Sequence, residues 1–266
     1  MKPRVLTLAN QKGGVGKTTT TINLATALAA VGERVLIIDI DPQGNASTGL
    51  GISRQLREIS SLDVLMGEAE IEQAMIATDV PNVGLVPSVM DLLGLELTIA
   101  EQSDRAFRLR DAINRATGLM IDGKPLSYVL IDCPPSLNLL TINALAAADA
   151  VVVPLQCEFF ALEGLSQLLQ TIEQIRTALN PSLYIQGVVM TMYDRRNNLS
   201  DQVLKDVRSE LGDLVYDTVI PRNVRLSEAP SYGQPALLYD LKCAGSQAYL
   251  KLASEVIKRE RRLNAA

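Results

Sequence analysis

One short segment limits the fold of this chain more than any other feature of its sequence. Residues 12–19 read KGGVGKTT, three residues after the apolar run Val5–Leu8 and leading into a helical pattern that starts near Thr18. Glycines let the backbone turn so that successive N–H groups point into one concavity, and a helix N-terminus adds its dipole at the same place. A strand, a glycine-rich loop and a helix in this order predict a phosphate-binding loop in an α/β fold.

Apolar runs and helical patterns alternate along the rest of the chain, least clearly from Ser53 to Glu101. Most runs lack polar alternation, as expected for strands that are covered on both faces. We therefore predict a single-domain P-loop NTPase fold over residues 1–266, with a mostly parallel twisted sheet and helices on both faces. The expected strands are Arg4–Ala9, Arg34–Asp39, Val83–Pro87, Tyr128–Asp132, Ala150–Leu155, Tyr184–Met190 and Leu214–Ile220. The expected helices are Thr18–Val31, Asp104–Ala116, Leu139–Ala147, Leu162–Leu179, Ser200–Leu211 and Ser246–Arg262.

Composition excludes several classes of protein. The chain has no histidine, which excludes Ser-His-Asp and Cys-His catalysis and a histidine-bound zinc site. Its three cysteines are far apart and form no CxxC pair, as is typical of structural thiols in the cytosol. The net charge of −5 argues against a surface coated in positive charge. The N-terminus lacks a signal-peptide pattern and no apolar run approaches the ~20 residues of a membrane span, so we expect a cytoplasmic protein.

The loop itself departs from the ordinary pattern G-x-x-x-x-G-K-[ST] at one position. Gln11 stands where that pattern has glycine, and an additional lysine, Lys12, follows it. The remaining features agree with a nucleotide site: Lys17 is placed to reach β- and γ-phosphates, and the Thr18 hydroxyl to ligate Mg²⁺.

Three aspartates end aliphatic runs. Asp39 and Asp41 follow one such run, and Asp132 ends another in the manner of a Walker B strand. Ligands of open α/β sheets bind outside the carboxyl ends of the strands, beside the phosphate loop. A carboxylate at the end of a buried strand is costly unless it is paired or bound to metal, and Mg²⁺ binds carboxylates largely through its own waters. The alternatives are a purely structural role for Asp39 and a solvated strand end for Asp132.

Four stretches of the sequence resemble the ParA/MinD ATPases, which carry a deviant Walker A loop. The loop KGGVGKTT is the first, and residues 35–45, VLIIDIDPQGN, resemble the second family motif. Residues 130–145, LIDCPPSLNLLTINAL, resemble the Walker B region, and residues 219–232, VIPRNVRLSEAPSY, are close to the chromosomal ParA, or Soj, branch. The resemblance extends from about Lys2 to Lys258. It implies an ATP hydrolase that segregates chromosome or plasmid DNA with a ParB-like protein bound at centromere-like sites.

The resemblance also implies roles for individual residues. Asp41 positions the attacking water, and Lys12 and Lys17 complete the catalytic set. Mg²⁺ is held by Thr18 and Asp132, with Asp39 acting through water. ATP or ADP is bound by Lys12, Gly13, Gly14, Val15, Gly16, Lys17, Thr18 and Thr19, with Pro221 and Asn223 flanking the adenine.

Two of these assignments have alternatives. The family's signature lysine, Lys12, reaches the other subunit's nucleotide in an ATP-dependent homodimer, yet the sequence equally allows it to contact its own phosphates. Pro221 and Asn223 also fit a simple Pro-Arg-Asn turn without a ligand.

The family suggests that the nucleotide state controls DNA binding. Arg196 and Arg225 match positions used for DNA contact in the Soj branch, and Arg195 and Arg222 are neighbouring candidates. Residues 194–225 contain six basic and six acidic residues, so any DNA surface depends on folding the arginines onto one face. Without a base-reading element, we expect binding to double-stranded DNA without sequence preference and a nucleoid-associated location.

Two other outputs are possible on this scaffold. A MinD-like positioning ATPase binds membranes, but the basic tail 258–266 has one leucine and no aromatic residue, whereas an interfacial helix needs an apolar face. We therefore expect no membrane partner. An iron–sulfur reductase needs clustered cysteines, and only Cys133 lies beside a candidate site residue, Asp132.

Overall fold

The computed structural model describes residues 2–116 and 118–263. Its main sheet has seven strands in the order β3-β4-β2-β7-β1-β8-β9, and all neighbouring pairs are parallel except β3 with β4. A separate hairpin joins β5 and β6. The strands are β1 (Arg4–Leu8), β2 (Val35–Asp39), β3 (Ile76–Ala77), β4 (Val83–Val86), β5 (Met120–Ile121), β6 (Lys124–Pro125), β7 (Tyr128–Asp132), β8 (Ala150–Gln156) and β9 (Tyr184–Thr191).

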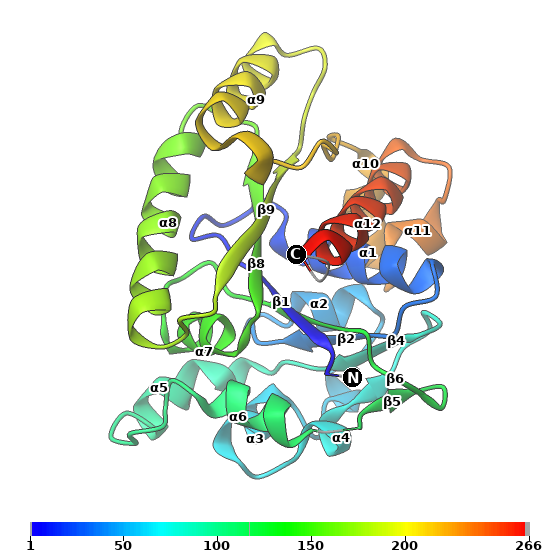
Figure 1. Ribbon diagram of the computed structural model, residues 1–266. Helices are drawn as coiled ribbons and strands as arrows, with labels where there is room; N and C mark the ends of the chain where they lie inside the picture. The colour runs from blue at the N-terminus through cyan, green and yellow to red at the C-terminus, as the bar shows by residue number, and fades with distance from the viewer. Residues whose placement is uncertain (1, 117, 264–266) are drawn as a thin grey trace.

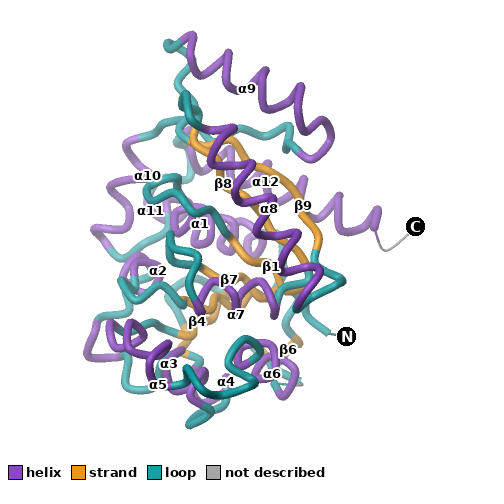
Figure 2. Tube along the Cα trace, turned by 90° about the vertical axis from the view of Figure 1, so that its left-hand side faces the viewer, coloured by secondary structure: helices purple, strands orange, loops and turns teal. Residues whose placement is uncertain are grey.

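Helices cover both faces of this sheet. In Figure 1, α1 and α12 lie on one side of the strands and α7 and α8 on the other; the α7–α8 side faces the viewer in Figure 2. The helices are α1 (Lys17–Ala30), α2 (Asn45–Gly49), α3 (Ser61–Met66), α4 (Ile71–Ala74), α5 (Leu95–Thr98), α6 (Arg108–Arg115), α7 (Leu139–Ala147), α8 (Ala161–Ala178), α9 (Asn198–Leu211), α10 (Val224–Glu228), α11 (Ala236–Tyr239) and α12 (Ala244–Leu263). Short 3-10 helices lie at Arg54–Leu56, Met90–Gly94, Gly212–Leu214 and Ala229–Tyr232.

The apolar runs form strands because the sheet is buried on both sides. In β1, Val5 packs in a core with residues of α6, α7 and α8, whereas Leu6 and Leu8 pack in a second core with residues of α1 and α12. Alternate residues of a strand point to opposite faces, so a strand between two cores must be apolar throughout. The predicted α/β fold with a mostly parallel sheet is confirmed.

One predicted strand, Leu214–Ile220, is wrong. Within the segment only Val215 forms a bridge, with Val188 of β9, and the N–H groups of Tyr216 and Ile220 donate to the Val188 and Met190 carbonyls without continuing a ladder. Its central N–H groups, at Asp217 and Thr218, donate to the Glu255 carboxylate of α12 at 2.8 and 3.1 Å. At these two central residues a side chain from a distant helix thus takes the place of a strand partner, which no local pattern could indicate.

Two other expectations need adjustment. The helix expected from Asp104 begins only at Arg108, because a turn precedes it in which Phe107 N–H donates to the Asp104 carbonyl. The stretch from Ser53 to Glu101 contains short helices and the antiparallel edge strand β3. Within residues 2–116 and 118–263, no helix combines the length and the apolar character needed to cross a membrane.

The strand order determines where the site forms. The adjacent strands β2 and β7 end with Asp39 and Asp132. The glycine-rich loop follows β1, the strand on the other side of β7. Since parallel strands end at one edge of the sheet, three segments that are distant in sequence meet there.

Candidate functional site: a phosphate loop with buried carboxylates

The loop between β1 and α1 has the geometry of an anion cradle. Gly14 and Gly16 have φ angles of 76° and 91°, a conformation that residues with a Cβ rarely adopt. Gly16 immediately precedes α1, no side chain among the described residues caps this helix, and its first turn carries no acidic residue. The N–H groups of the first turn and the positive end of the helix dipole are therefore available to a phosphate.

Lys17 places a positive charge over this loop. Its side chain is almost fully buried, and its Nζ donates to the Lys12 carbonyl oxygen at 3.1 Å. Burial lowers the pKa of Lys17, while the nearby carboxylates of Asp132 and Asp41 oppose the shift. The ammonium is thus located between the loop backbone and two carboxylates, where a bound polyphosphate requires a cation.

Asp132 and Asp39 form a buried carboxylate pair. They are register partners on the adjacent strands β7 and β2, and both are fully buried. Asp132 accepts hydrogen bonds from the hydroxyls of Thr18 (2.7 Å) and Thr21 (2.9 Å). Asp39 accepts from the N–H and hydroxyl of Ser47, at 2.9 and 2.7 Å. Neighbouring strands lie about 4.8 Å apart. Two ionised carboxylates on such strands repel each other strongly when both are buried.

The electrostatics of the pair fit a divalent cation. Burial, followed by the charge of Asp39, raises the pKa of Asp132 to about 8, and burial chiefly raises the pKa of Asp39 to about 6. A cation beside Thr18 and Asp132 would favour the ionised carboxylates. Among the described residues, no group of three or more His, Cys, Asp or Glu side chains is arranged to hold a metal ion. The Thr18 hydroxyl and the Asp132 carboxylate supply oxygen atoms, the donors that Mg²⁺ takes beside the several waters it retains.

These shifts predict an unusual pH dependence of stability. The folded state retains protons on Asp132 and Asp39 that the unfolded state releases above about pH 4, so the free energy of unfolding falls as the pH rises from about 4 to 8. The chain has no histidine to obscure the window from pH 6 to 8. We expect the Tm of the ligand-free protein to fall by about 5 °C or more across this window, measured by thermal unfolding.

The comparison variant for this experiment is Asp132→Asn, which keeps the shape of the side chain but cannot ionise. Its Tm should change much less between pH 6 and 8 and should exceed that of the unsubstituted protein at pH 8. Asp91→Asn, at an exposed position, is the control. Equal pH dependence in all three proteins would contradict this description of the carboxylate pair.

Asp41 lies just beyond the end of β2, in the turn that leads to α2. It is nearly buried, and its Oδ1 accepts the N–H of Gln43 at 3.0 Å. Its carbonyl oxygen accepts the Ser88 hydroxyl at 2.5 Å and the Gly44 N–H at 2.8 Å. The turn thus holds this carboxylate near Lys17, on which it exerts an electrostatic effect.

Lys12 is directed away from the loop. Its Nζ forms an ion pair with Glu158, which lies in the segment that follows β8. Its backbone N–H donates to Asn10 Oδ1 at 3.0 Å, and Asn10 in turn donates to the Pro154 carbonyl at 2.8 Å. In this ligand-free chain, the Lys12 ammonium therefore contacts the rim of the site and not the cradle.

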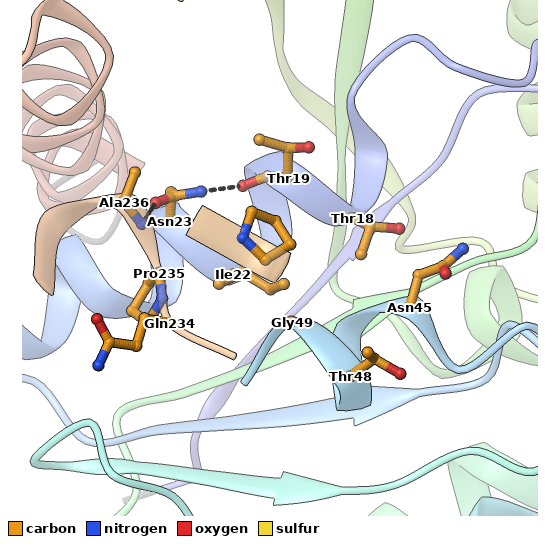
Figure 3. A pocket seen from close by; sticks show the side chains of 11 residues that line it. Thr18, Thr19, Ile22, Asn23, Asn45, Thr48, Gly49, Gln234, Pro235 and Ala236 are labelled. Carbon is orange, nitrogen blue, oxygen red and sulfur yellow. Dashed lines mark hydrogen bonds between the residues drawn. The ribbon is translucent and has the colours of Figure 1, made fainter. Parts of the chain in front are cut away.

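A hollow of about 290 Å³ opens beside the first turn of α1. Figure 3 shows Thr18 and Thr19 on one side of it, Asn45 and Thr48 of α2 on another, and the segment 234–236 opposite. Asn23 links two of these walls, because its Nδ2 donates to the Thr19 carbonyl and its Oδ1 accepts the Ala236 N–H, at 2.8 and 2.9 Å. The hollow thus adjoins the threonine that faces Asp132.

Pro221 and Asn223 lie next to the carboxyl end of β9. Thr191, the last residue of β9, donates its hydroxyl to the Val15 carbonyl of the loop at 2.8 Å. Two residues later, the backbone of Tyr193 forms a bridge with Pro221. Asn223 also has a structural role, since its side chain caps α10 by accepting the Arg225 N–H at 2.9 Å.

The candidate DNA-contacting arginines separate into two groups. Arg195, Arg196 and Arg222 line a hollow of about 880 Å³ together with Lys251 of α12. The side chain of Arg196 is 89% accessible. Its guanidinium binds both oxygens of Asp194 at 3.0 and 2.9 Å and lowers the pKa of that carboxyl to about 2.

Arg225 is not among the residues that line that hollow. It pairs with Glu228 at 2.8 Å and with Asp240 at 3.5 Å, and it lies over the ring of Tyr239. The four arginines that sequence reasoning grouped together therefore have different surroundings.

Sequence reasoning missed several residues of the site. Thr21 is one of them, although its spacing of three residues from Thr18 in a helix is a usable signal, because such residues share a face. Ser47 and Glu158 gave no comparable signal, since both meet their partners only through the tertiary fold.

Comparisons with known proteins agree with this geometry. A family model described as an AAA domain matches residues 3–185. The chromosome partitioning protein ParA of Caulobacter vibrioides is 66% identical over 260 residues, which cover 97% of this chain and 95% of the relative. The sporulation initiation inhibitor protein Soj of Bacillus subtilis is 49% identical, covering 95% and 98% of the two chains. A solved structure of a cobyrinic acid a,c-diamide synthase from Mycobacterium smegmatis, with bound ADP and magnesium, superposes with a TM-score of 0.83 at 37% identity, covering 97% and 96%.

A parallel sheet, an uncapped helix after a glycine-rich loop, and a loop lysine beside a strand-end aspartate define a P-loop NTPase. With a relative 66% identical over almost its whole length, the chain belongs to the ParA family of chromosome-partitioning ATPases. Its enzyme class is ATP hydrolase.

Proposed function

We propose that this protein is a DNA-partition ATPase whose Mg-ATP-bound dimer binds DNA and whose hydrolysis to ADP releases it. The observation that carries the proposal is the assembly, at one edge of the sheet, of an uncapped α1, Lys17 and the Thr18–Asp132 pair. The whole chain, residues 1–266, acts as one ATPase domain.

The cradle binds the phosphates of ATP or ADP through the backbone of residues 13–19. When the nucleotide binds, the Lys17 ammonium exchanges its hydrogen bond to the Lys12 carbonyl for contacts with the β- and γ-phosphates. Thr18 and Asp132 would hold Mg²⁺, and Asp39 would support it through water. When bound, Mg²⁺ would neutralise part of the negative charge of the phosphates.

Asp41 orients the attacking water. The turn that follows β2 holds the Asp41 carboxylate in place for this role, close enough to Lys17 to raise the pKa of its ammonium. Positioning and electrostatics account for most of the catalysis in phosphoryl transfer. Pro221 and Asn223 flank the adenine, a placement supported by the contact between β9 and the loop through Thr191.

The ATP-bound form is a homodimer in which Lys12 reaches the other subunit's nucleotide. Two features support this. Lys12 has a single ion-pair partner among the described residues, Glu158, which an incoming phosphate can replace. Exposed apolar side chains also flank the loop on both sides, with Leu137 after β7 and Phe159 and Phe160 after β8. Since β1 lies between β7 and β8, a second copy packed over the loop would cover all three.

DNA binding is provided by arginine contacts to phosphates. Arg195, Arg196 and Arg222 share one hollow, and Lys251 adds a fourth cation to it; Arg225 contributes from its separate position. Backbone contacts of this kind carry no sequence information, so binding is nonspecific. Dimerisation doubles the number of phosphate contacts. The dimer therefore binds DNA, whereas a monomer of net charge −5 does not.

A ParB-like centromere-binding protein is the proposed stimulator of hydrolysis. The ATPase itself is proposed to be cytoplasmic and associated with the nucleoid, without a membrane partner. This proposal is preferred over a MinD-like role because the 66% identity is to a chromosome partitioning protein.

Lys12→Ala tests the dimer. We expect it to retain nucleotide affinity within about twofold, because its ammonium lies outside the cradle, while ATP-dependent dimerisation falls by about tenfold or more, the consequence of losing one charge-assisted contact per site. The measurement is sedimentation velocity with ATP, alongside nucleotide titration.

Lys242→Ala, at an exposed position, is the control. Dimerisation of Lys12→Ala equal to that of the control would favour the alternative in which Lys12 acts on its own phosphates. A large loss of nucleotide affinity in the monomer would do so as well.

A further inference from the structure

Arg57 is a buried cation that the proposed chemistry does not use. Only 7% of its surface is exposed, and it follows the 3-10 helix Arg54–Leu56. None of the ion pairs formed by the described residues includes it. Burial lowers the pKa of the guanidinium, and the charge of Asp39 opposes this shift from beyond ion-pair distance. The hydrogen bonds of Arg57 must therefore compensate for much of the cost of burying its charge.

The hydrogen bonds of Arg57 go to three residues in two segments of the chain. Nη1 donates to the Ser88 carbonyl at 3.1 Å. Nη2 donates to the Thr48 hydroxyl and to the Ile52 carbonyl, both at 2.8 Å, and Nε donates to the Ile52 carbonyl at 3.2 Å. The planar guanidinium therefore joins the end of α2 to the segment after β4, with its donors in a fixed geometry.

Both of these segments hold the turn that carries Asp41. Ser88 donates its hydroxyl to the Asp41 carbonyl at 2.5 Å, and its N–H donates to the Ser47 hydroxyl at 3.1 Å. Thr48 donates its hydroxyl to the Gly44 carbonyl at 3.0 Å. Each end of the turn, Asp41 and Gly44, is thus one hydrogen-bonded residue away from Arg57.

The guanidinium also packs directly against the turn. Gly44 has a φ of 61°, and a Cβ added to it would lie 2.3 Å from Arg57 Nη1 and 3.2 Å from the Ser88 carbonyl oxygen. The turn can approach this closely only because residue 44 has no side chain. This contact and the hydrogen bonds restrict the conformation of the same turn, from Asp41 to Gly44.

We propose that Arg57 is a positioning residue for hydrolysis, which holds the Asp41–Gly44 turn so that the Asp41 carboxylate faces the attacking water. The inference rests on the proposed role of Asp41. Misplacement of a catalytic group by about 1 Å lowers a rate by up to about 100-fold. Arg57 therefore affects turnover without touching the nucleotide.

The test compares three substitutions at two positions on the intact chain. Arg57→Met keeps much of the side-chain volume and removes every donor, and Arg57→Lys keeps the charge but not the fork. Arg54→Ala is the matched control, since Arg54 is exposed in the adjoining 3-10 helix. Steady-state ATP turnover, nucleotide Kd and Tm are measured for each protein.

We expect Arg57→Met to lower kcat by about 10- to 100-fold while the nucleotide Kd changes less than about twofold. The kcat of Arg57→Lys should fall between those of this variant and the control, because one ammonium cannot reach all three acceptor residues. An unchanged kcat in folded Arg57→Met, or a Kd that weakens in proportion to kcat, overturns the proposal. The second result is what a purely structural role would produce.

Gly44→Ala perturbs the same contact from the other side and keeps the proposal testable should Arg57→Met fail to fold. It should lower kcat with little change in Kd, and combined with Arg57→Lys its effect should be less than the product of the two single effects. Multiplicative effects would contradict a shared contact. Asp41→Ala is measured in parallel: normal turnover in that variant refutes the role of Asp41, whereas its loss together with normal turnover in Arg57→Met refutes only the role of Arg57.

Discussion

A Lys17→Ala variant is expected to lose ATP turnover almost completely. The ammonium is the cation held over the cradle, and the loop amides alone leave the charge of a triphosphate poorly neutralised. We expect nucleotide affinity to fall by about 10- to 100-fold, as for loss of a hydrogen bond to a charged group. Turnover at saturating ATP should fall by a further 10²–10³-fold or so, as for removal of a donor that stabilises developing charge.

The measurements are nucleotide titration and phosphate release on the same preparation. Because Lys17 is buried and interacts electrostatically with Asp132, Tm is followed to show that the variant is folded. Lys242→Ala serves again as the control. Turnover and affinity close to those of the control would refute the assignment of the phosphate loop.

Asp41→Ala is expected to separate nucleotide binding from hydrolysis. The substitution leaves the cradle, Lys17 and the Thr18–Asp132 pair in place, so ATP and Mg²⁺ still bind. Without a carboxylate to orient the water, turnover should fall by about 100-fold or more. The expected species is a long-lived ATP-bound dimer.

Sedimentation velocity with ATP, and again after exchange into ADP, detects that species. Asp91→Ala, an exposed position, is the control. If Asp41→Ala sediments as a monomer with ATP although it binds the nucleotide, hydrolysis and dimer lifetime are not linked through this residue. Normal turnover would remove Asp41 from the catalytic set.

The strands that were predictable from sequence are those whose local pattern, an uninterrupted apolar run, corresponds to a single structure. A strand buried on both faces must be apolar throughout, which identified β1, β2, β7 and β8. The Leu214–Ile220 segment has a similar composition, but its two central N–H groups, at Asp217 and Thr218, are satisfied by Glu255, nearly forty residues further along the chain. Composition cannot reveal which partner a backbone group finds.

The site shows the same division. Asp132 and the glycine-rich loop are placed by strand order, and strand ends and loop motifs are visible in a sequence. The partners Glu158 and Ser47 are determined by packing between elements and were not predicted. Arg196 and Arg225 were grouped because both match DNA-contact positions of the Soj branch, with Arg195 and Arg222 as neighbouring candidates, whereas the fold gives Arg225 its own acidic partners.

The most direct test of the proposed function is DNA binding measured without nucleotide, with ADP and with ATP, by fluorescence anisotropy on two unrelated duplexes across a salt series. Asp41→Ala provides the stable ATP-bound form. We predict tight binding only with ATP, equal affinity for the two duplexes, and a steep dependence on salt whose log–log slope decreases by about 0.9 for each phosphate contact removed. Arg196→Ala should decrease the slope while leaving the dimer intact. Equal binding in all three nucleotide states, or a hundredfold preference for one duplex, would contradict an ATP-driven dimer that binds DNA through its phosphates.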